Sequence, residues 1–333
     1  MPEIDRATRV KRELFLRVLL PTKPPPAVAR QLVTLMVDRR YEAGDIIYEK
    51  GGQADTVYFI VEGEVELIGE ESDEPWRFGA GSIIGVIDMN AQRPRARTAT
   101  ALGPVDMLVV SREGWYEVFE DNLEYSSQVR TVQGKALHQF RLELGADGGF
   151  DRRHLTPEQA LEAAVVEGTM VERLVALRAA LHLETTSVQS IAELAKRAEL
   201  LRASRGDIVL SPGGAGNAIY FVLAGLVDVE RRVAPPLAAA FGPGDLVLGG
   251  AAFAGGLNEY AVTARSDATL LRLNFSDIDD VAEDHFELVR AMLRGVALER
   301  ETLMGIRARR QKKASIPPPN SRETAPEPAK RAG

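Results

Sequence analysis

The chain contains 333 residues, of which 45% are hydrophobic and 27% are charged. This balance is typical of globular proteins, and the length is enough for two domains with cores of their own. The formal net charge of −7 argues against a general nucleic-acid-binding surface. The sequence has no cysteine, which excludes disulfides, thiolate metal sites and cysteine nucleophiles.

Motifs of catalysis are also missing from the sequence. The four histidines lie far apart, without the spacing of metal ligands, and there is no P-loop, nucleophile elbow or HExxH motif. We therefore predict that the protein is not an enzyme and carries no metal or other cofactor. No run is long and apolar enough to span a bilayer, and residues 1–14 lack the apolar core of a signal peptide. We expect a cytoplasmic protein without a membrane partner.

The first predicted elements are a helix and a series of short strands. Residues 27–37 follow a triple proline and carry apolar side chains at helical spacing. From residue 46 to residue 67, apolar residues alternate with other residues between glycine turns, which indicates strands with one buried face. The alternating residues are Ile46, Tyr48, Val57, Phe59, Val61, Val65 and Leu67.

Helical patterns return in the middle of the chain. Between residues 115 and 144, apolar residues recur at about the helical period, which predicts one or two amphipathic helices. Thr156 and Pro157 form an N-cap and first-turn signal for a further helix that runs to about His182. Another helix is expected over residues 188–201. We interpret each apolar stripe as packing against a neighbouring β unit.

The chain contains one unit twice, and this repeat determines the predicted fold. Residues 39–67 and 201–229 both read Gly-Asp-Ile, then Gly-Gly, then Tyr-Phe, then a glycine before alternating apolar residues. Further on, FGAGSIIG in the first copy matches FGPGDLVLGG in the second. Short strands at this spacing predict a mainly β fold with flanking helices, in which two small, jelly-roll-like β-barrels are joined by helices.

The C-terminal residues change in character after a predicted helix from about 282 to 306. Residues 307–333 contain five prolines and eight basic residues, and we expect a disordered tail. Within it, KKASI is similar to a basic-directed phosphorylation or pseudosubstrate site, but we favour an ordinary tail serine at Ser315. The predicted parts are a first domain (1–144), a helical linker (145–185), a degenerate second domain (186–306) and the tail (307–333).

The stretch AQRPRARTATA, residues 91–101, places three arginines within five residues after a glycine-punctuated apolar run. A phosphate site needs backbone N–H groups that converge on one point and a guanidinium that neutralises the charge. Gly85, a short helix after it and Arg95 meet both needs. The alternative for Arg95 is an ordinary surface arginine. Arg93 and Arg97 are expected to be solvated, but strand alternation places Arg97 on the same face as Arg95, so a different register would bring Arg97 into the site.

These motifs resemble the cyclic-nucleotide-binding domain family, in the tandem arrangement of protein kinase A regulatory subunits. RRYEAGDII, YFIVEGEV, GSIIGVI and PRART match successive motifs of the family, and the resemblance covers about residues 14–140 and 186–300. It implies a ligand-binding cassette in the first domain, with cAMP or cGMP as the ligand and Arg95 at its phosphate. The cassette residues are Gly85, Val86, Ile87, Arg95 and Ala96.

The resemblance also shows where the sequence departs from the family. Val86 stands where the family has a glutamate that accepts from the ribose, so binding in the first domain should be weakened. In the second copy, Gly249 or Gly250 stands at the glutamate position and Asn258 at the arginine position, with Glu259 next to it. A carboxylate there would repel phosphate, so we predict that the second domain binds no cyclic nucleotide.

Two functions remain open at this point. The leading hypothesis is a regulatory protein, a tandem sensor module that acts through an unknown protein partner and binds an anion or nucleotide weakly in the first domain only. The alternative is a non-binding docking scaffold for other proteins. Nucleic-acid binding is disfavoured, because no helix-turn-helix segment follows the predicted long helix and the basic stretch RARRQKK lacks aromatic residues for stacking.

Overall fold

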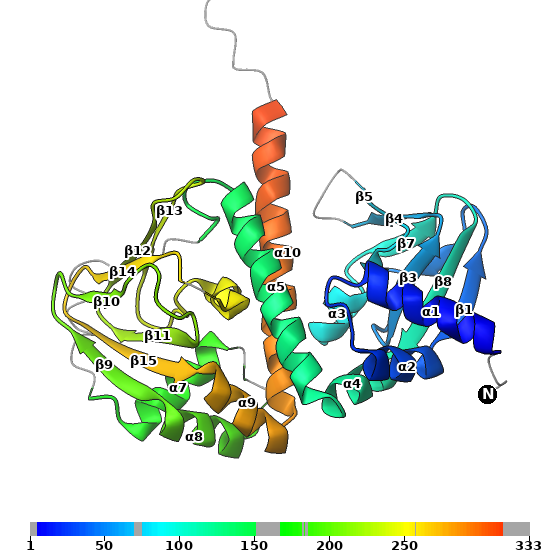
Figure 1. Cartoon of the computed structure of the whole chain (residues 1–333). Coiled ribbons are helices and arrows are strands. Elements are labelled where there is room, and N and C mark those ends of the chain that lie inside the picture. Colours follow the sequence, from blue (N-terminus) through cyan, green and yellow to red (C-terminus); the bar gives the residue numbers. More distant parts are fainter. Residues whose placement is uncertain are drawn as a thin grey trace, which may run out of the picture.

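The computed structural model describes residues 5–69, 75–150, 167–181, 183, 186–256 and 258–315. Within these residues, two β units with flanking helices lie on either side of a pair of long helices (Figure 1). The long helices are α5 (Leu123–Glu143), which follows the first unit, and α10 (Glu287–Ser315), which ends the described chain. No helix of the described part is long and apolar enough to cross a membrane.

The first copy of the unit contains two antiparallel sheets, with strand orders β1-β8-β3-β6 and β2-β7-β4-β5. Two helices precede the sheets, one short helix lies between β6 and β7, and α4 follows β8. The elements are α1 (Arg6–Leu19), α2 (Pro26–Leu35), β1 (Val37–Tyr41), β2 (Ile46–Tyr48), β3 (Thr56–Glu62), β4 (Glu64–Ile68), β5 (Trp76–Gly79), β6 (Ile83–Ile84), α3 (Val86–Asn90), β7 (Thr98–Ala101), β8 (Val105–Ser111) and α4 (Arg112–Glu120).

The second copy repeats this plan with the strand orders β11-β15-β9 and β10-β14-β12-β13. A 3-10 helix, η1, stands in the place of α3. The elements are α7 (Met170–Ala180), α8 (Val188–Arg197), β9 (Glu199–Ala203), β10 (Ile208–Leu210), β11 (Ala218–Ala224), β12 (Val227–Arg231), β13 (Leu237–Phe241), η1 (Gly249–Ala254), β14 (Ala261–Ala264), β15 (Ala268–Asn274) and α9 (Phe275–Asp284).

The predicted fold class is confirmed, with one difference in how the strands close. Each copy is mainly antiparallel β with flanking helices, but its strands form two separate sheets instead of one closed barrel. In the first copy, Ile60 and Met107 of one sheet pack in the same apolar cluster as Val65 and Ala99 of the other. Because this packing buries the inner faces without strand pairing between the sheets, the result is a sandwich.

Two predicted helices have other bounds in the structure. The start of the helix expected from Thr156 to about His182 falls on residues 151–166, which lie outside the described residues. The prediction that this one helix continues to His182 is wrong, because residues 167–169 are not helical and a separate helix, α7, begins after Thr169. A capping box at Thr169 and Glu172 begins α7. The prediction that the last helix ends near residue 306 is wrong, because α10 continues to Ser315. Residues 307–315 contain no proline or glycine, so nothing in their sequence breaks the helix.

The two copies meet along α5 and α10. Gly134 on α5 permits close packing on η1, because a Cβ at this position would lie 2.5 Å from the backbone of Phe253 and Ala254. Val289 and Leu293 of α10 belong to the main apolar cluster of the first copy. The helix that ends the second copy therefore helps to bury the core of the first, and separate folding of the two predicted domains stays a prediction.

Candidate functional site

The cassette of the first copy begins where β6 ends. Gly85 has a positive φ of 80° and forms the N-cap of α3, which contains Val86 and Ile87 in its first turn. A Cβ at Gly85 would lie 2.7 Å from Nη1 of Arg95 and 3.0 Å from the carbonyl oxygen of Thr56. Both the backbone conformation and the close approach of Arg95 therefore require glycine here.

Arg95 is the most deeply buried charged side chain of this cassette, with 2% of its surface exposed. Its Nη1 donates to the carbonyl of Gly85 at 2.6 Å, and its Nη2 donates to the carbonyl of Thr56 at 2.6 Å. The guanidinium lies over the ring of Tyr48, 4.4 Å from the centroid. Arg95 thus connects the start of α3 to the start of β3.

The charge of Arg95 has no counter-ion among the described residues. Its Nε is buried without a hydrogen-bond partner, and only backbone carbonyls accept from its terminal nitrogens. Burial raises the pKa of Tyr48 while Arg95 offsets part of that rise, so the neighbouring phenol stays protonated and supplies no negative charge. An enclosed cation without an anion is unfavourable by several kcal/mol, so this arrangement is suited to accept an anion.

The structure brings the predicted cassette residues together and adds one that the sequence analysis missed. Asp88 of α3 is buried and accepts from the backbone N–H of Ala96 at 3.2 Å and from the guanidinium of Arg93 at 2.8 Å. Asp88 therefore connects α3 to the segment that contains Arg93 and Ala96. Val86 packs against the apolar cluster of the first copy, which fits the absence of a carboxylate at this position.

The expectation that Arg93 and Arg97 are solvated is wrong. Glu301 of α10 lies 2.6 Å from Arg93 and 3.3 Å from Arg97, and the Arg97 guanidinium lies 3.7 Å from the ring centroid of Trp76. Burial acts to raise the pKa of Glu301, but hydrogen bonds from Arg93 and Arg97 outweigh it, so the pKa is lowered. No spacing in the sequence points to these pairs, because more than 200 residues separate the partners.

The same helix holds the cassette of the second copy. Glu299 accepts from the backbone N–H of Gly250 in η1 at 2.6 Å and from Arg141 of α5 at 2.8 Å. Glu299 and Glu301 are two residues apart on α10, so one short segment of this helix contacts both cassettes. A displacement of either cassette would therefore act on α10 through Glu299 or Glu301.

Backbone hydrogen bonds identify the equivalent positions of the two cassettes. Arg95 exchanges backbone hydrogen bonds of 2.8 and 2.9 Å with residues 51–52, and Asn258 exchanges bonds of 2.7 and 2.8 Å with residues 213–214. Asn258 therefore occupies the place of Arg95. Its side chain donates to the carbonyl of Ser211 at 2.9 Å and carries no charge.

A cavity of about 230 Å³ lies beside Asn258 in the second copy. Glu259 lines it and is held by Arg231 at 2.7 Å, and Tyr260 bonds His138 at 2.8 Å. The hydrogen bond from Arg231 lowers the pKa of Glu259, which keeps its carboxylate ionised at neutral pH. The side chain at the position of Arg95 thus offers no cation, and an acid lies next to it.

Residues 38–122 and 200–285 match the family model described as cyclic nucleotide-binding domain, and together they make up just over half of the chain. The chain belongs to the cyclic nucleotide-binding domain family. Both cassettes lie inside the matched segments, so the tandem arrangement is a property of this family member. Domains of this family are typically regulatory and not catalytic.

Solved structures found by a structural comparison include regulatory parts of protein kinase A. The regulatory subunit of a cAMP-independent protein kinase A from Trypanosoma brucei has 18% identity and a TM-score of 0.33, covering 94% of this chain and 98% of that chain. The regulatory domain of Toxoplasma gondii protein kinase A with cAMP has 15% identity and a TM-score of 0.32, covering 87% and 97%. A comparison with curated proteins found no match.

Proposed function

We propose that this member of the cyclic nucleotide-binding domain family is a regulatory sensor whose first copy binds cAMP or cGMP weakly through Arg95 and acts through a protein partner. The observation that carries the proposal is the guanidinium of Arg95, which is 2% exposed, lacks a carboxylate partner among the described residues and has an unbonded Nε. A cyclic phosphate would supply the missing negative charge. A cytoplasmic location stays part of this proposal.

A bound phosphate would compete with the present contacts of Arg95. The carbonyls of Gly85 and Thr56 are neutral acceptors, and hydrogen bonds to an ionised acceptor are roughly twice as strong. Exchange at Gly85 would release the contact between Arg95 and the first turn of α3. The ligand would therefore alter how the cassette is held.

The change at α3 has a route to a partner through α10. Arg93 and Arg97 flank the ligand-binding Arg95, and both pair with Glu301 of α10. A shift of the cassette that weakens these pairs would favour a different placement of α10. In this proposal α10 is the readout, together with α5, which packs along it.

Calorimetry of the full chain with cAMP and cGMP tests the sensor proposal. We expect weak saturable binding that falls by about ten- to a hundredfold in Arg95→Lys, because lysine keeps the charge but loses the planar fork. Val86→Glu should strengthen binding by a similar factor, because it restores an acceptor for the ribose. Thermal melting of each variant checks that it is folded, and Arg77→Lys, on the exposed part of β5, is the matched control.

A docking scaffold without a ligand is the second candidate. It is favoured by the fact that both terminal nitrogens of Arg95 already donate to the protein. In that case Arg95 is a structural tie, and Arg95→Lys changes the melting temperature only. If the wild type, Arg95→Lys and Val86→Glu all bind neither nucleotide, the sensor proposal is overturned in favour of the scaffold.

A further inference from the structure

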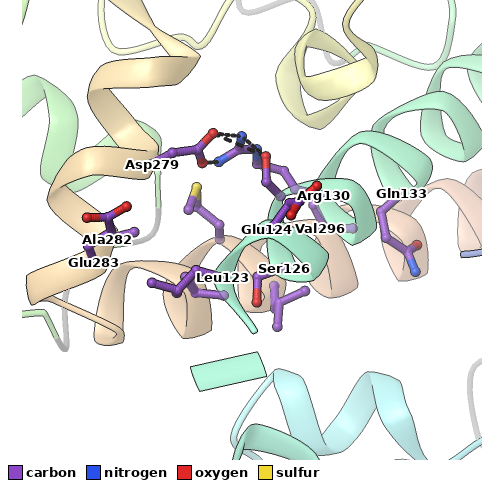
Figure 2. Close-up of a pocket in the computed structure, with 13 residues that line it drawn as sticks. Leu123, Glu124, Ser126, Arg130, Gln133, Asp279, Ala282, Glu283 and Val296 are labelled. Carbon is purple, nitrogen blue, oxygen red and sulfur yellow. Dashed lines mark hydrogen bonds and ion pairs between the residues drawn. The ribbon is translucent and has the colours of Figure 1, made fainter. Parts of the chain in front are cut away.

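The helices between the two copies cover one another's apolar faces. Leu123 of α5 and Val296 of α10 line one shared cavity, and Arg130 of α5 pairs with Asp279 of α9 at 2.6 Å on its wall (Figure 2). Two other helices, α1 and α7, differ in this respect. Each presents apolar side chains on a face that no described part of the chain covers.

The uncovered face of α1 is a continuous apolar stripe. Val10, Leu14 and Val18 follow one another at intervals of four residues, so they lie side by side along the helix. Their exposed fractions are 47%, 53% and 72%, whereas Leu16 on the opposite face is fully buried. Single exposed apolar residues are common, but a row of three on one helix face forms a patch of the kind found at interaction sites. We call these three residues the α1 stripe.

The second copy has an equivalent stripe on α7. This helix precedes α8 and β9 as α1 precedes α2 and β1. The buried Leu16 of α1 corresponds to Leu177, which is the fully buried leucine of α7. The same offset along the sequence aligns the α1 stripe with Val171 and Val175, which are 68% and 64% exposed. We call Val171 and Val175 the α7 stripe.

The charges beside the two stripes differ in sign. In α7, Glu172 stands at the position that Lys11 has in α1, and Glu167, just before α7, stands at the position of Arg6. Hydrogen bonds from Thr169 lower the pKa of Glu172, so this carboxylate is ionised at neutral pH. Arg178 is the cation of the α7 face, whereas the α1 face carries four exposed cations and one half-buried acid: Arg6, Arg9, Lys11, Arg17 and Glu13. The basic α1 face is therefore suited to the α7 face and would repel another α1 face.

We propose that α1 of one molecule docks on α7 of a second copy of this chain. The two stripes would be buried against each other, with the cations of α1 beside Glu167 and Glu172. In one chain, α1 and α7 lie on opposite sides of the pair of long helices (Figure 1), so this contact requires two molecules. Because each molecule carries one stripe of each kind, the contact joins unlike faces. It is independent of nucleotide binding and of the function proposed above.

Sedimentation velocity of the full chain at increasing concentration tests this docking. We expect the wild type to associate as its concentration rises. Leu14→Glu and Val175→Glu each place a charge within one apolar stripe, so each should weaken the association by about tenfold or more. Ile208→Glu is the matched control, because Ile208 is an apolar residue of β10, 68% exposed and outside both stripes. Thermal melting of each variant checks that it is folded.

An equimolar mixture of Leu14→Glu and Val175→Glu identifies which helices pair. The first variant keeps its α7 stripe and the second keeps its α1 stripe, so the mixture should associate although neither variant does so alone. The proposal is overturned if the wild type stays a monomer, if the control weakens association as strongly as the stripe variants, or if the mixture does not associate. Loss of association in only one of the two stripe variants would also overturn it, because like helices would then pair.

Discussion

The two cassettes of this protein share a pair of backbone hydrogen bonds and differ in the side chain that stands at that pair. Arg95 and Asn258 make the same pair of backbone hydrogen bonds, each to a Gly-Gly turn. In the first copy a guanidinium lies over Tyr48 and reaches the carbonyl of Gly85, whereas in the second copy a cavity of about 230 Å³ lies beside a neutral amide. The two copies therefore have the same fold but differ in the charge of the side chain at this position, and in our proposal this charge decides whether an anion is bound.

The neighbouring acids strengthen this difference. The carboxylate of Asp88 in the first cassette accepts hydrogen bonds from Arg93 and from the backbone N–H of Ala96, so both of its partners lie within the cassette. Glu259 in the second cassette also pairs with an arginine, Arg231, but it lines the cavity and stays ionised. A duplicated unit can therefore keep its fold while the charged side chains of its two sites differ.

The largest expected effect is on the free energy of unfolding, and it shows whether the first copy depends on α10 for its stability. Leu293→Ala removes a buried α10 side chain from the apolar cluster of the first copy and should lower the free energy of unfolding by about 2 to 5 kcal/mol. Urea unfolding of the full chain measures it. Val233→Ala, at an exposed position before β13, is the control and should change stability by about 0.5 kcal/mol at most. A loss no larger than that of the control would mean that each copy has a self-sufficient core.

Separate expression of residues 1–150 and 151–310 extends this test. We expect both fragments to fold, as the repeat predicts, with the first melting at a lower temperature than the full chain. The reason is that this fragment lacks Val289 and Leu293, which cover its main cluster. If only the full chain folds, the two units form one cooperative structure.

The next prediction concerns whether one position accounts for the expected difference in anion binding between the cassettes. Asn258→Arg combined with Glu259→Gln places a cation at the equivalent position and removes the adjacent acid. In an Arg95→Lys background, cAMP affinity should rise by about 1.5 to 3 kcal/mol, or roughly ten- to a hundredfold. Calorimetry measures it, with Glu259→Gln alone as the control. No gain would show that the backbone of the second cassette does not suit a phosphate.

A smaller effect is expected where α10 holds the first cassette. Glu301→Gln removes the carboxylate shared by Arg93 and Arg97, but Arg93 keeps Asp88 and Arg97 keeps the ring of Trp76. The loss in the free energy of unfolding should therefore be about 1 to 2 kcal/mol at pH 7.

The pH dependence of this loss follows from the lowered pKa of Glu301. Its contribution is complete above the usual value of 4.5 and is lost as the pH falls through the lower pKa of the folded state. The difference between wild type and Glu301→Gln should therefore shrink below about pH 4.5 in unfolding experiments. Glu113→Gln, at an exposed pair, serves as the control. A difference that is constant with pH would contradict the assigned ion pairs.

The smallest expected effect is a change of pKa in the second copy. Burial lowers the pKa of His138 below its usual 6.5, while Glu259 acts to raise it. Stability from neutral His138 is present above pH 6.5 and is lost as the pH falls through the lower folded-state pKa. Glu259→Gln should lower this pKa further, which proton NMR of the imidazole would measure. An unchanged pKa would mean that Glu259 does not act on His138.

Local patterns in the sequence predicted much of the fold and part of the site. The repeat, the glycine turns and the alternating apolar residues predicted two β units, and only ten residues separate Gly85 from Arg95, so their proximity depends on a short segment. The same patterns placed Arg93 and Arg97 in solvent and ended the last helix near residue 306. Both errors concern α10, whose partners lie in distant parts of the chain.

Patterns in the sequence were enough to predict a tandem repeat and to match Arg95 with Asn258 of the second copy, and the family resemblance implied a glutamate position at Val86. The folded chain adds the pair of Glu301 with Arg93, the contacts of Asp88 within the cassette, and the burial of Arg95 without a counter-ion among the described residues. These two groups of features differ in how far apart in the sequence the interacting residues are. Turns, strands and helix starts depend on neighbouring residues, whereas burial and ion pairing depend on which distant surfaces pack together, and no local spacing records that.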